Sequence, residues 1–277
     1  MKKVCLYLLF LLLCTSPVYG SAYSKLLKSP DTELKYNAAL NYYEKGDYTK
    51  TITLLEDISR TYKGTETAEN ILYVLSSSYF KKKDYISASH YYNTYVNTYL
   101  RGSHYTECLF MLAYCYYKQS PHPELDQTET LKAIERFQIY INQFPNDSRI
   151  PEAKKMLGEM YNKLADRELY NARLYYNLGN YKGNNYRAAI VTAHNAMNDY
   201  PDSPYKEEFA LIIVRSKYKE AVNSVQKKVK DRSEDAWDEC YYFLQEYPES
   251  KHKKEVEKIA SSLNKIIKPT EVETSLK

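Results

Sequence analysis

The sequence predicts an all-α fold built from stacked pairs of helices. The chain of 277 residues contains only 7 Gly and 10 Pro, which favours long regular elements over loops. No segment alternates polar and apolar residues with a period of two, so we expect almost no strand. In addition, an aromatic residue followed by helix-breaking residues returns five times along the chain, which indicates an internal repeat.

The second half of each repeat carries a small residue followed four positions later by an apolar or bulky one. The five endings of the repeats lie at 62–64, 99–102, 144–148, 200–203 and 247–250. A small residue lets a partner helix approach closely, and the residue one turn later fills the next gap. The predicted pairs are Thr51 and Leu55, Ala88 and Tyr92, Ala133 and Phe137, Ala189 and Ala193, and Ala236 and Cys240.

The first half of each repeat has a pattern of its own. Residues 72–79 and 109–116 both read Leu-x-x-Leu, then a small residue, then Tyr three positions on, and Leu157-Gly158-x-x-Tyr161 carries the second half. With the small residue on the following helix, this resembles the tetratricopeptide signature. The sequence therefore predicts a tetratricopeptide-repeat solenoid of about five helix-turn-helix repeats, with a C-terminal capping helix at 251–267.

The repeats are longer than the roughly 34 residues of a minimal unit. Residues 46–48 and 83–85 mark the turns inside the first two repeats, and the Pro-rich segment 121–126 lengthens the turn inside the third. The run 152–178 predicts an extended first helix in the fourth repeat. Residues 205–230 predict another long helix in the fifth.

The N-terminus reads as a secretory signal. Lys2 and Lys3 precede an apolar run at 4–13 that is too short to span a bilayer, and small residues follow at 18–20. We therefore expect residues 1–20 to be a signal peptide of an exported protein, and 268–277 to be a disordered polar tail. Without the signal the chain is nearly neutral, which argues against nucleic acid as the main partner.

Three of the five cysteines lie outside the predicted signal. Cys108 and Cys115 are two turns apart on one predicted helix, about 10 Å at 1.5 Å per residue, which is too far for a disulfide. Cys240 is distant in sequence. All three are expected to be small core residues.

The first helices predict a concave surface lined with aromatic residues. Such a groove, with Lys45, Lys81 and Lys118 near its edge, suits an extended peptide with aromatic side chains and a terminal carboxylate. The alternative is that these rings serve packing between repeats, as aromatic residues in repeat helices often do. The candidate peptide-binding residues are Tyr36, Tyr43, Tyr73, Phe80, Phe110, Tyr114 and Tyr117.

Nothing in the sequence indicates catalysis. The five His are scattered without metal-ligand spacing, and the seven Gly form no phosphate-binding loop. No nucleophile motif is present. We therefore expect no catalytic residue, no metal site and no cofactor.

Six segments of the mature chain carry a more specific resemblance. They are residues 23–29 (YSKLLKS), 35–38 (KYNA), 42–48 (YYEKGDY), 144–148 (FPNDS), 161–165 (YNKLA) and 200–203 (YPDS). Over about residues 22–265, the chain resembles the BamD family of outer-membrane protein assembly factors, particularly its Bacteroidetes members. One departure is that Gly20 or Ser21 stands where this family has its lipid-bearing cysteine.

The resemblance implies a periplasm-facing scaffold at the cell outer membrane. The N-terminal repeats, 21–149, are implied to recognise unfolded outer-membrane proteins, whose C-terminal segment typically ends in an aromatic residue. The C-terminal repeats and capping helix, 150–267, are implied to bind the barrel-forming subunit BamA. The alternative is another exported tetratricopeptide adaptor, associated with the cell wall or with division.

Overall fold

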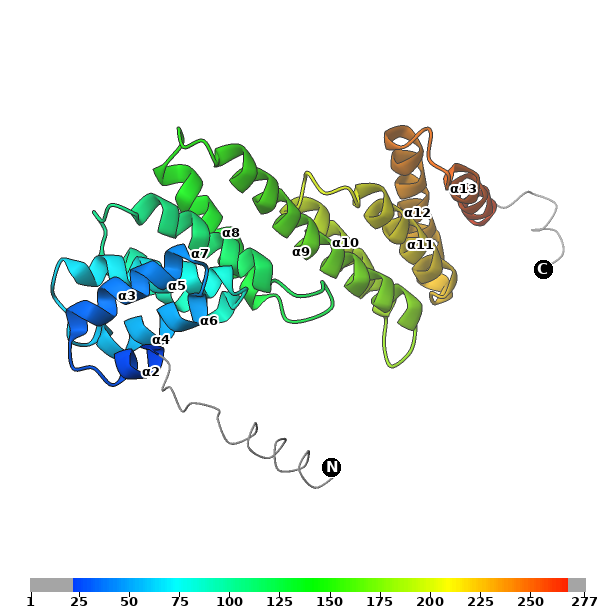
Figure 1. Ribbon diagram of the computed structural model, residues 1–277. Coiled ribbons are helices and arrows are strands. Elements are labelled where there is room, and N and C mark those ends of the chain that lie inside the picture. Colours follow the sequence, from blue (N-terminus) through cyan, green and yellow to red (C-terminus); the bar gives the residue numbers. More distant parts are fainter. Residues whose placement is uncertain (1–21, 269–277) are drawn as a thin grey trace, which may run out of the picture. The chain divides into compact units, whose positions relative to one another are not determined.

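The computed structural model describes residues 22–268, which consist of helices joined by turns (Figure 1). The predicted signal peptide and the predicted tail beyond Lys268 lie outside these residues. The all-α class is confirmed, and no strand occurs in the described range. The twelve helices are α2 (Ala22–Leu27), α3 (Thr32–Glu44), α4 (Tyr48–Ser59), α5 (Thr67–Lys81), α6 (Tyr85–Thr98), α7 (Tyr105–Gln119), α8 (Thr128–Gln143), α9 (Ile150–Leu178), α10 (Asn185–Asp199), α11 (Lys206–Val222), α12 (Gln226–Glu246) and α13 (Lys253–Ile267).

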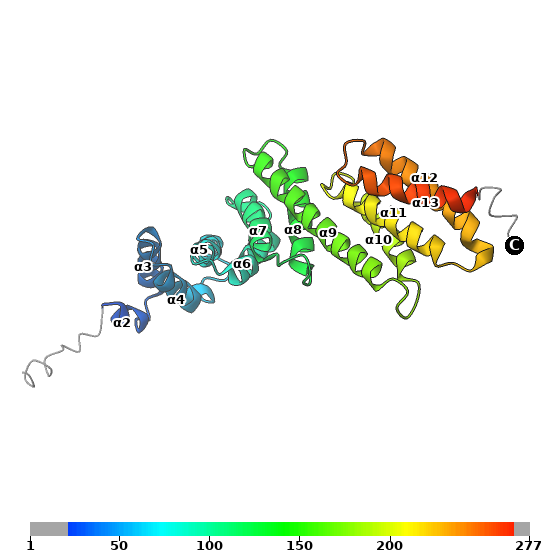
Figure 2. The ribbon, with the colours of Figure 1, turned by 90° about the vertical axis from the view of Figure 1, so that its right-hand side faces the viewer.

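The chain divides into two compact units between Cys115 and Tyr116. In the first, α3 packs on α4, α4 on α5 and α5 on α6, and α3 also contacts α5. In the second, each helix from α8 to α13 packs on the next, and α11 also contacts α9 and α13. Figure 2 shows α11, α12 and α13 side by side. Such contacts between successive and alternate helices are those of stacked tetratricopeptide-type helix pairs, as predicted.

The ten residues of the five pairs predicted on the second helices are all in the core. Each has at most 1% of its surface exposed. Because the second helix of a pair carries Ala, Thr or another small residue at the contact, its backbone approaches the first helix closely. The bulkier members of the set are Leu55, Tyr92, Phe137 and Cys240.

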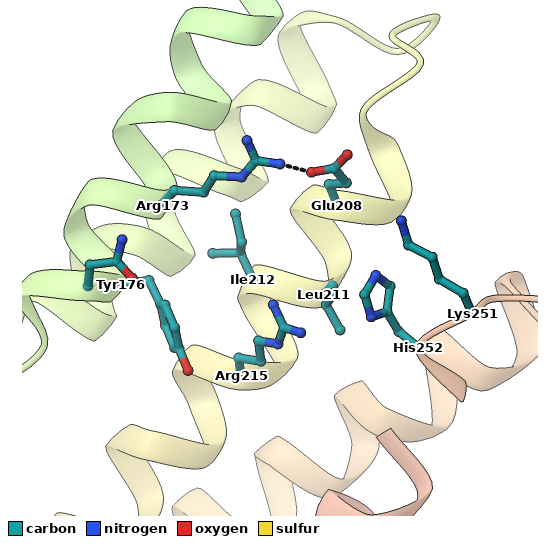
Figure 3. A pocket seen from close by; sticks show the side chains of 9 residues that line it. Arg173, Tyr176, Glu208, Leu211, Ile212, Arg215, Lys251 and His252 are labelled. Carbon is teal, nitrogen blue, oxygen red and sulfur yellow. Dashed lines mark hydrogen bonds and ion pairs between the residues drawn. The ribbon is translucent and has the colours of Figure 1, made fainter. Parts of the chain in front are cut away.

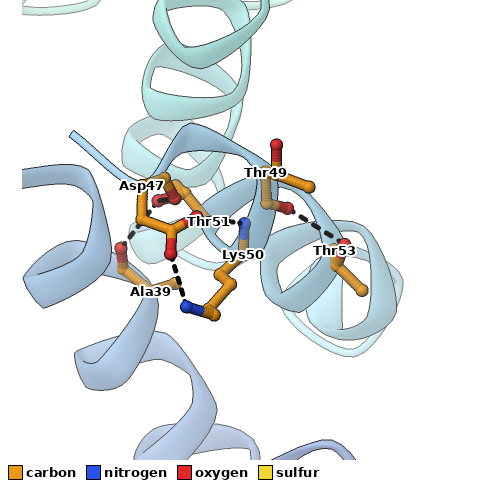
Figure 4. Close-up of polar contacts among 6 residues, drawn as sticks. All are labelled: Ala39, Asp47, Thr49, Lys50, Thr51 and Thr53. Atoms are coloured by element: carbon orange, nitrogen blue, oxygen red, sulfur yellow. Dashed lines mark hydrogen bonds and ion pairs between the residues drawn. The ribbon is translucent and has the colours of Figure 1, made fainter. Parts of the chain in front are cut away.

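Thr51 shows why the first repeat tolerates a polar residue at this contact (Figure 4). Its hydroxyl donates to the Ala39 carbonyl at 3.3 Å and to the Asp47 carbonyl at 3.1 Å. A buried hydroxyl costs free energy only when it lacks a partner. Thr51 therefore fits where the second to fifth repeats use Ala.

The turns inside the first two repeats share one design. Asp47 and Asp84 cap α4 and α6, because their carboxylates accept from backbone N–H groups three residues later, at 3.2 and 3.0 Å. The residue before each cap has positive φ, 78° at Gly46 and 63° at Lys83. The predicted turns are confirmed at both places.

The expected long helix over 205–230 is wrong, because α11 ends at Val222 and α12 begins at Gln226. The Asn223 amide donates to the Lys219 carbonyl at 2.7 Å, and the Ser224 hydroxyl donates to the Glu220 carbonyl at 2.6 Å. Short polar side chains that bind nearby carbonyls compete with helix continuation. The extended first helix of the fourth repeat and the capping helix are confirmed as α9 and α13.

The three cysteines of the described chain behave as predicted. Cys108, Cys115 and Cys240 are completely buried and form no disulfide with one another. Burial raises the pKa of the Cys115 and Cys240 thiols to about 12. They are therefore protonated core side chains at neutral pH.

A carboxylate fixes the turn that leads into α7. Glu69, in the first turn of α5, accepts from the Tyr95 hydroxyl at 2.6 Å and from the Ser103 backbone N–H at 2.9 Å. The Tyr95 hydroxyl also accepts from the His104 N–H at 3.0 Å. Gly102 lies against this group, because a Cβ there would stand 2.5 Å from the Tyr95 hydroxyl oxygen.

Two glycine substitutions are expected to shift stability in opposite directions. Gly158→Ala should raise the free energy of unfolding by about 0.5–1 kcal/mol, because Gly158 lies inside α9 with open space around it. Gly102→Ala should lower it, because the new methyl group displaces the Tyr95 and Glu69 side chains. Urea unfolding followed by circular dichroism measures both. If both variants changed the free energy of unfolding by the same amount and in the same direction, the close packing at Gly102 would be contradicted.

The Glu69 group predicts a pH dependence. Its hydrogen bond from Tyr95, helped by those from Ser103, holds the pKa of Glu69 below the ordinary value of 4.5. A depressed folded-state pKa contributes stability above the unfolded-state value, and this contribution disappears as pH falls through the folded-state value. Between pH 6 and pH 3, Glu69→Gln should therefore lose less unfolding free energy than the wild type. Glu66→Gln, an exposed residue one turn earlier, should follow the wild type.

Candidate functional site

The candidate aromatic residues all lie on first helices of their pairs. Tyr36 and Tyr43 are on α3, Tyr73 and Phe80 are on α5, and the remaining three are on α7. Phe110 and Tyr114 belong to the first unit together with those of α3 and α5, whereas Tyr117 belongs to the second unit.

Five of these rings are half-buried and reach the surface of the first unit. We call them the aromatic row; they are Tyr36, Tyr43, Tyr73, Phe80 and Tyr114. Phe110 differs from the expectation of a surface position, because only 5% of it is exposed and its ring stacks on that of Tyr114 at 6.2 Å between centroids. Phe110 therefore belongs to the core beneath the aromatic row, where it contacts the Tyr114 ring.

The hydroxyls on α3 are bound by the next first helix. The Tyr36 hydroxyl accepts from the Asn70 amide at 2.6 Å, and the Tyr43 hydroxyl shares a 2.7 Å hydrogen bond with the Ser77 hydroxyl. Both partners are on α5, and both lie 34 residues further along the chain. These bonds join consecutive first helices.

The same spacing continues from α5 to α7. The Tyr73 hydroxyl donates to the Glu107 carboxylate at 3.1 Å, again over 34 residues. The rings of Phe80 and Tyr114, also 34 residues apart, lie 5.7 Å from each other. The Tyr73 ring additionally stacks on His104 at 3.8 Å. Positions 34 residues apart thus meet across the junctions between first helices.

Sequence reasoning missed these contacts, although the signal was present. The repeat endings are spaced irregularly, and that irregularity concealed the regular distance between the first three first helices. Adding 34 to the numbers of Tyr36, Tyr43 and Tyr73 gives Asn70, Ser77 and Glu107, each of which has a side chain able to bind a phenol. The packing role and the surface role therefore fall on the same residues.

The contacts determine what the row offers to a ligand. Burial, reinforced by Glu107, raises the pKa of Tyr73 well above its ordinary range, so its hydroxyl stays protonated and bound. The hydroxyls of Tyr36 and Tyr43 are similarly engaged. The rings are held in place while part of each remains exposed, so the row presents rigid apolar surface.

Tyr117 has a corresponding bond in the second unit. Its hydroxyl donates to Glu159 of α9 at 2.6 Å, and the Lys118 ammonium lies 5.4 Å from the centre of its ring. On the same face of α9, Lys163 donates to the Ser120 carbonyl at 3.2 Å and to the Ser120 hydroxyl at 2.7 Å. These bonds join α9 to the C-terminal end of α7.

The second unit contains a cavity of about 440 Å³ between α9, α11 and the start of α13 (Figure 3). Tyr176, Leu211 and Ile212 give it apolar walls, and charged side chains surround them. The other lining residues are Arg173, Asn177, Glu208, Arg215, Lys251 and His252.

The arginines of this cavity are held in place by carboxylates. Figure 3 shows Arg173 of α9 reaching across to Glu208 of α11, with which it forms an ion pair. Arg215 makes two hydrogen bonds of 2.7 Å to Glu255 of α13, and these raise its pKa. A cavity with apolar walls and a rim of positive and negative side chains suits a protein side chain that is part apolar and part polar.

In the part of the chain that the structure describes, no group of three or more His, Cys, Asp and Glu is arranged to hold a metal ion. None of the described helices is both long and apolar enough to cross a membrane.

Comparisons with known proteins agree with one another. The family described as YfiO, outer membrane lipoprotein, matches residues 28–181 and 178–276. A protein of Aquifex aeolicus (strain VF5) named "Putative outer membrane protein assembly factor BamD" is 27% identical over 232 residues, which are 80% of this chain and 71% of that protein. The outer membrane protein assembly factor BamD of Caulobacter vibrioides (strain ATCC 19089 / CIP 103742 / CB 15) is 17% identical over 181 residues, which are 63% of this chain and 57% of that protein.

The two segments of the family match together cover nearly all of the described residues. Both relatives carry the name BamD, the first as a putative assembly factor, which agrees with what the sequence motifs implied. The chain therefore belongs to the YfiO family of outer membrane lipoproteins, and its resemblance to BamD is confirmed.

Proposed function

We propose that this chain is a non-enzymatic scaffold of the outer-membrane β-barrel assembly machinery. It binds a BamA-like barrel protein and unfolded outer-membrane protein clients, and it promotes insertion of the clients. A role in outer membrane protein assembly follows from the family and from its BamD relatives. The division of labour between 21–149 and 150–267, and the location on the periplasmic face of the outer membrane, are parts of the proposal.

The aromatic row is the observation that carries client binding. Its rings are half-buried, and hydrogen bonds between consecutive first helices fix Tyr36, Tyr43 and Tyr73. Because the rings are already rigid, the protein loses little conformational freedom when a ligand binds, which favours affinity. Unfolded outer-membrane proteins typically end in an aromatic residue, and such a ring is the chemistry that this row would accept.

The cavity of the second unit supports the partner-binding role of the C-terminal repeats. Its arginines are already positioned by Glu208 and Glu255, so a partner meets an ordered rim. The apolar walls from α9 and α11 would take an aliphatic or aromatic side chain of a folded domain. Attachment of the chain to the outer membrane would come through this partner or through a lipid.

The row makes a direct prediction about peptide binding. The double variant Tyr36→Ala/Phe80→Ala should bind a fluorescein-labelled peptide ending in Phe about tenfold or more weakly than the wild type, because two ring contacts are lost. Fluorescence anisotropy measures the dissociation constants. Tyr181→Ala, which removes an exposed ring outside the row, should leave binding unchanged.

A second pair of variants separates the packing role from the binding role. Tyr36→Phe/Tyr73→Phe keeps both rings and removes two hydroxyls, so it should lower the free energy of unfolding by about 0.5–1.5 kcal/mol per bond while binding stays within about threefold. If Tyr36→Phe/Tyr73→Phe lost peptide binding as severely as Tyr36→Ala/Phe80→Ala does, the rings would not be the contact surface. Unchanged binding in the Ala variant would exclude the row altogether.

The partner prediction concerns the whole assembly. The full chain, purified from envelope membranes in mild detergent, should retain a BamA-like barrel protein identified by mass spectrometry. Arg215→Glu should reduce that recovery, because it repels Glu255 and disorders the rim of the cavity. Normal recovery with this variant would exclude the cavity as the contact. Septal localisation without any barrel protein would favour a cell-wall or division adaptor.

A further inference from the structure

A patch of exposed aromatic rings lies on α12, outside the aromatic row and the cavity. Trp237, Tyr241 and Tyr242 are 37%, 49% and 65% exposed. Trp237 stacks on Tyr241 with 6.0 Å between ring centroids and 12° between planes, and Tyr241 meets the Tyr242 ring edge-on at 6.3 Å. We call these three residues the α12 patch. The helix buries a different set of residues, namely Ser233, Ala236, Cys240 and Phe243.

The neighbouring helices leave the patch accessible. Among the described helices, α12 packs chiefly against α11 and α13, through the buried set (Figure 2). A single exposed aromatic residue needs no explanation, but three rings in mutual contact form a continuous apolar surface. Trp and Tyr are also the residue types most enriched where binding energy concentrates in protein interfaces.

The segment of α12 that carries the patch is acidic. Residues 233–246 contain five acidic residues and no Lys or Arg. Asp235 and Glu239 share one ammonium, because both pair with Lys217 of α11, at 3.0 and 2.8 Å. Glu234 and Asp238, one turn apart beside the rings, form no ion pair with any other described residue. The patch therefore combines exposed rings with uncompensated negative charge.

We propose that the α12 patch docks an arginine-bearing segment of a protein partner. A guanidinium is planar, so it stacks on an indole or phenol ring while its N–H groups donate to carboxylates. Trp237 and Tyr241 supply the rings, and Glu234 and Asp238 supply the carboxylates. An anionic membrane or an acidic segment would be repelled by the same carboxylates, so the charge selects a basic partner. This surface is independent of client binding at the aromatic row.

The sequence offers a selective probe of this patch. Trp237 is the only Trp of the chain, so tryptophan emission of the full-length protein reports the patch alone. A short capped peptide of Gly, Leu and three Arg should change this emission saturably, and less so as NaCl is raised. The same peptide with Lys in place of Arg should bind a few-fold more weakly, because Lys lacks the planar group. A version with Glu should produce no change.

Variants that keep Trp237 test the contacts. Glu234→Gln/Asp238→Asn should weaken binding of the Arg peptide about fivefold, and Tyr241→Ala should weaken it by a similar factor. Glu249→Gln, an exposed acid in the turn after α12, is the matched control and should bind like the wild type. Circular dichroism verifies that each variant is folded.

Three results would overturn the proposal. One is an emission of Trp237 that does not respond to the Arg peptide, and another is an equal response to the Glu peptide. The third is a blue shift of the emission with phosphatidylcholine–phosphatidylglycerol vesicles in the absence of any response to the Arg peptide, which would assign the patch to a membrane surface.

Discussion

Close contact between the two helices of each repeat is the constraint on which the rest of the structure depends. It requires a small residue on the second helix, and Ala88, Ala133, Ala189 and Ala236 have no exposed surface. Enlarging one of them would separate the pair and shift the following repeat, because close-packed interiors tolerate little extra volume. Thr51 satisfies the constraint differently, since its hydroxyl donates hydrogen bonds to the Ala39 and Asp47 carbonyls.

Correct stacking also places the surfaces that we connect with function. When first helices repeat at a distance of 34 residues, Tyr36 reaches Asn70 and Tyr73 reaches Glu107. These bonds stabilise the junctions and at the same time fix the rings at the surface. Packing and recognition are therefore not alternatives for these residues, because a ring held by its hydroxyl can still expose its face. The α12 patch differs, since the contacts of its rings lie within one helix.

Much of this architecture could be predicted from the sequence, because the repeat imposes local and periodic requirements. The buried pairs from Thr51 to Cys240, the Asp-capped turns and the long helix α9 all follow from short patterns. The break at 223–225 was missed because Asn and Ser are tolerated in helices, and their bonds to the Lys219 and Glu220 carbonyls at the end of α11 are not visible in the sequence. The burial of Phe110 was missed because the matching patterns 72–79 and 109–116 place it at the position of Tyr73, which is only half-buried.

Site-specific photocrosslinking tests the central claim, that the first helices present rings to an extended polypeptide, most directly. A benzoylphenylalanine residue would replace Tyr73 or Phe80 in the row, or Tyr91 on the second helix α6 as a control. Irradiation with a peptide ending in Phe should give crosslinks from the two row positions and essentially none from position 91. Equal crosslinking at all three positions, or crosslinks from position 91 alone, would contradict the account.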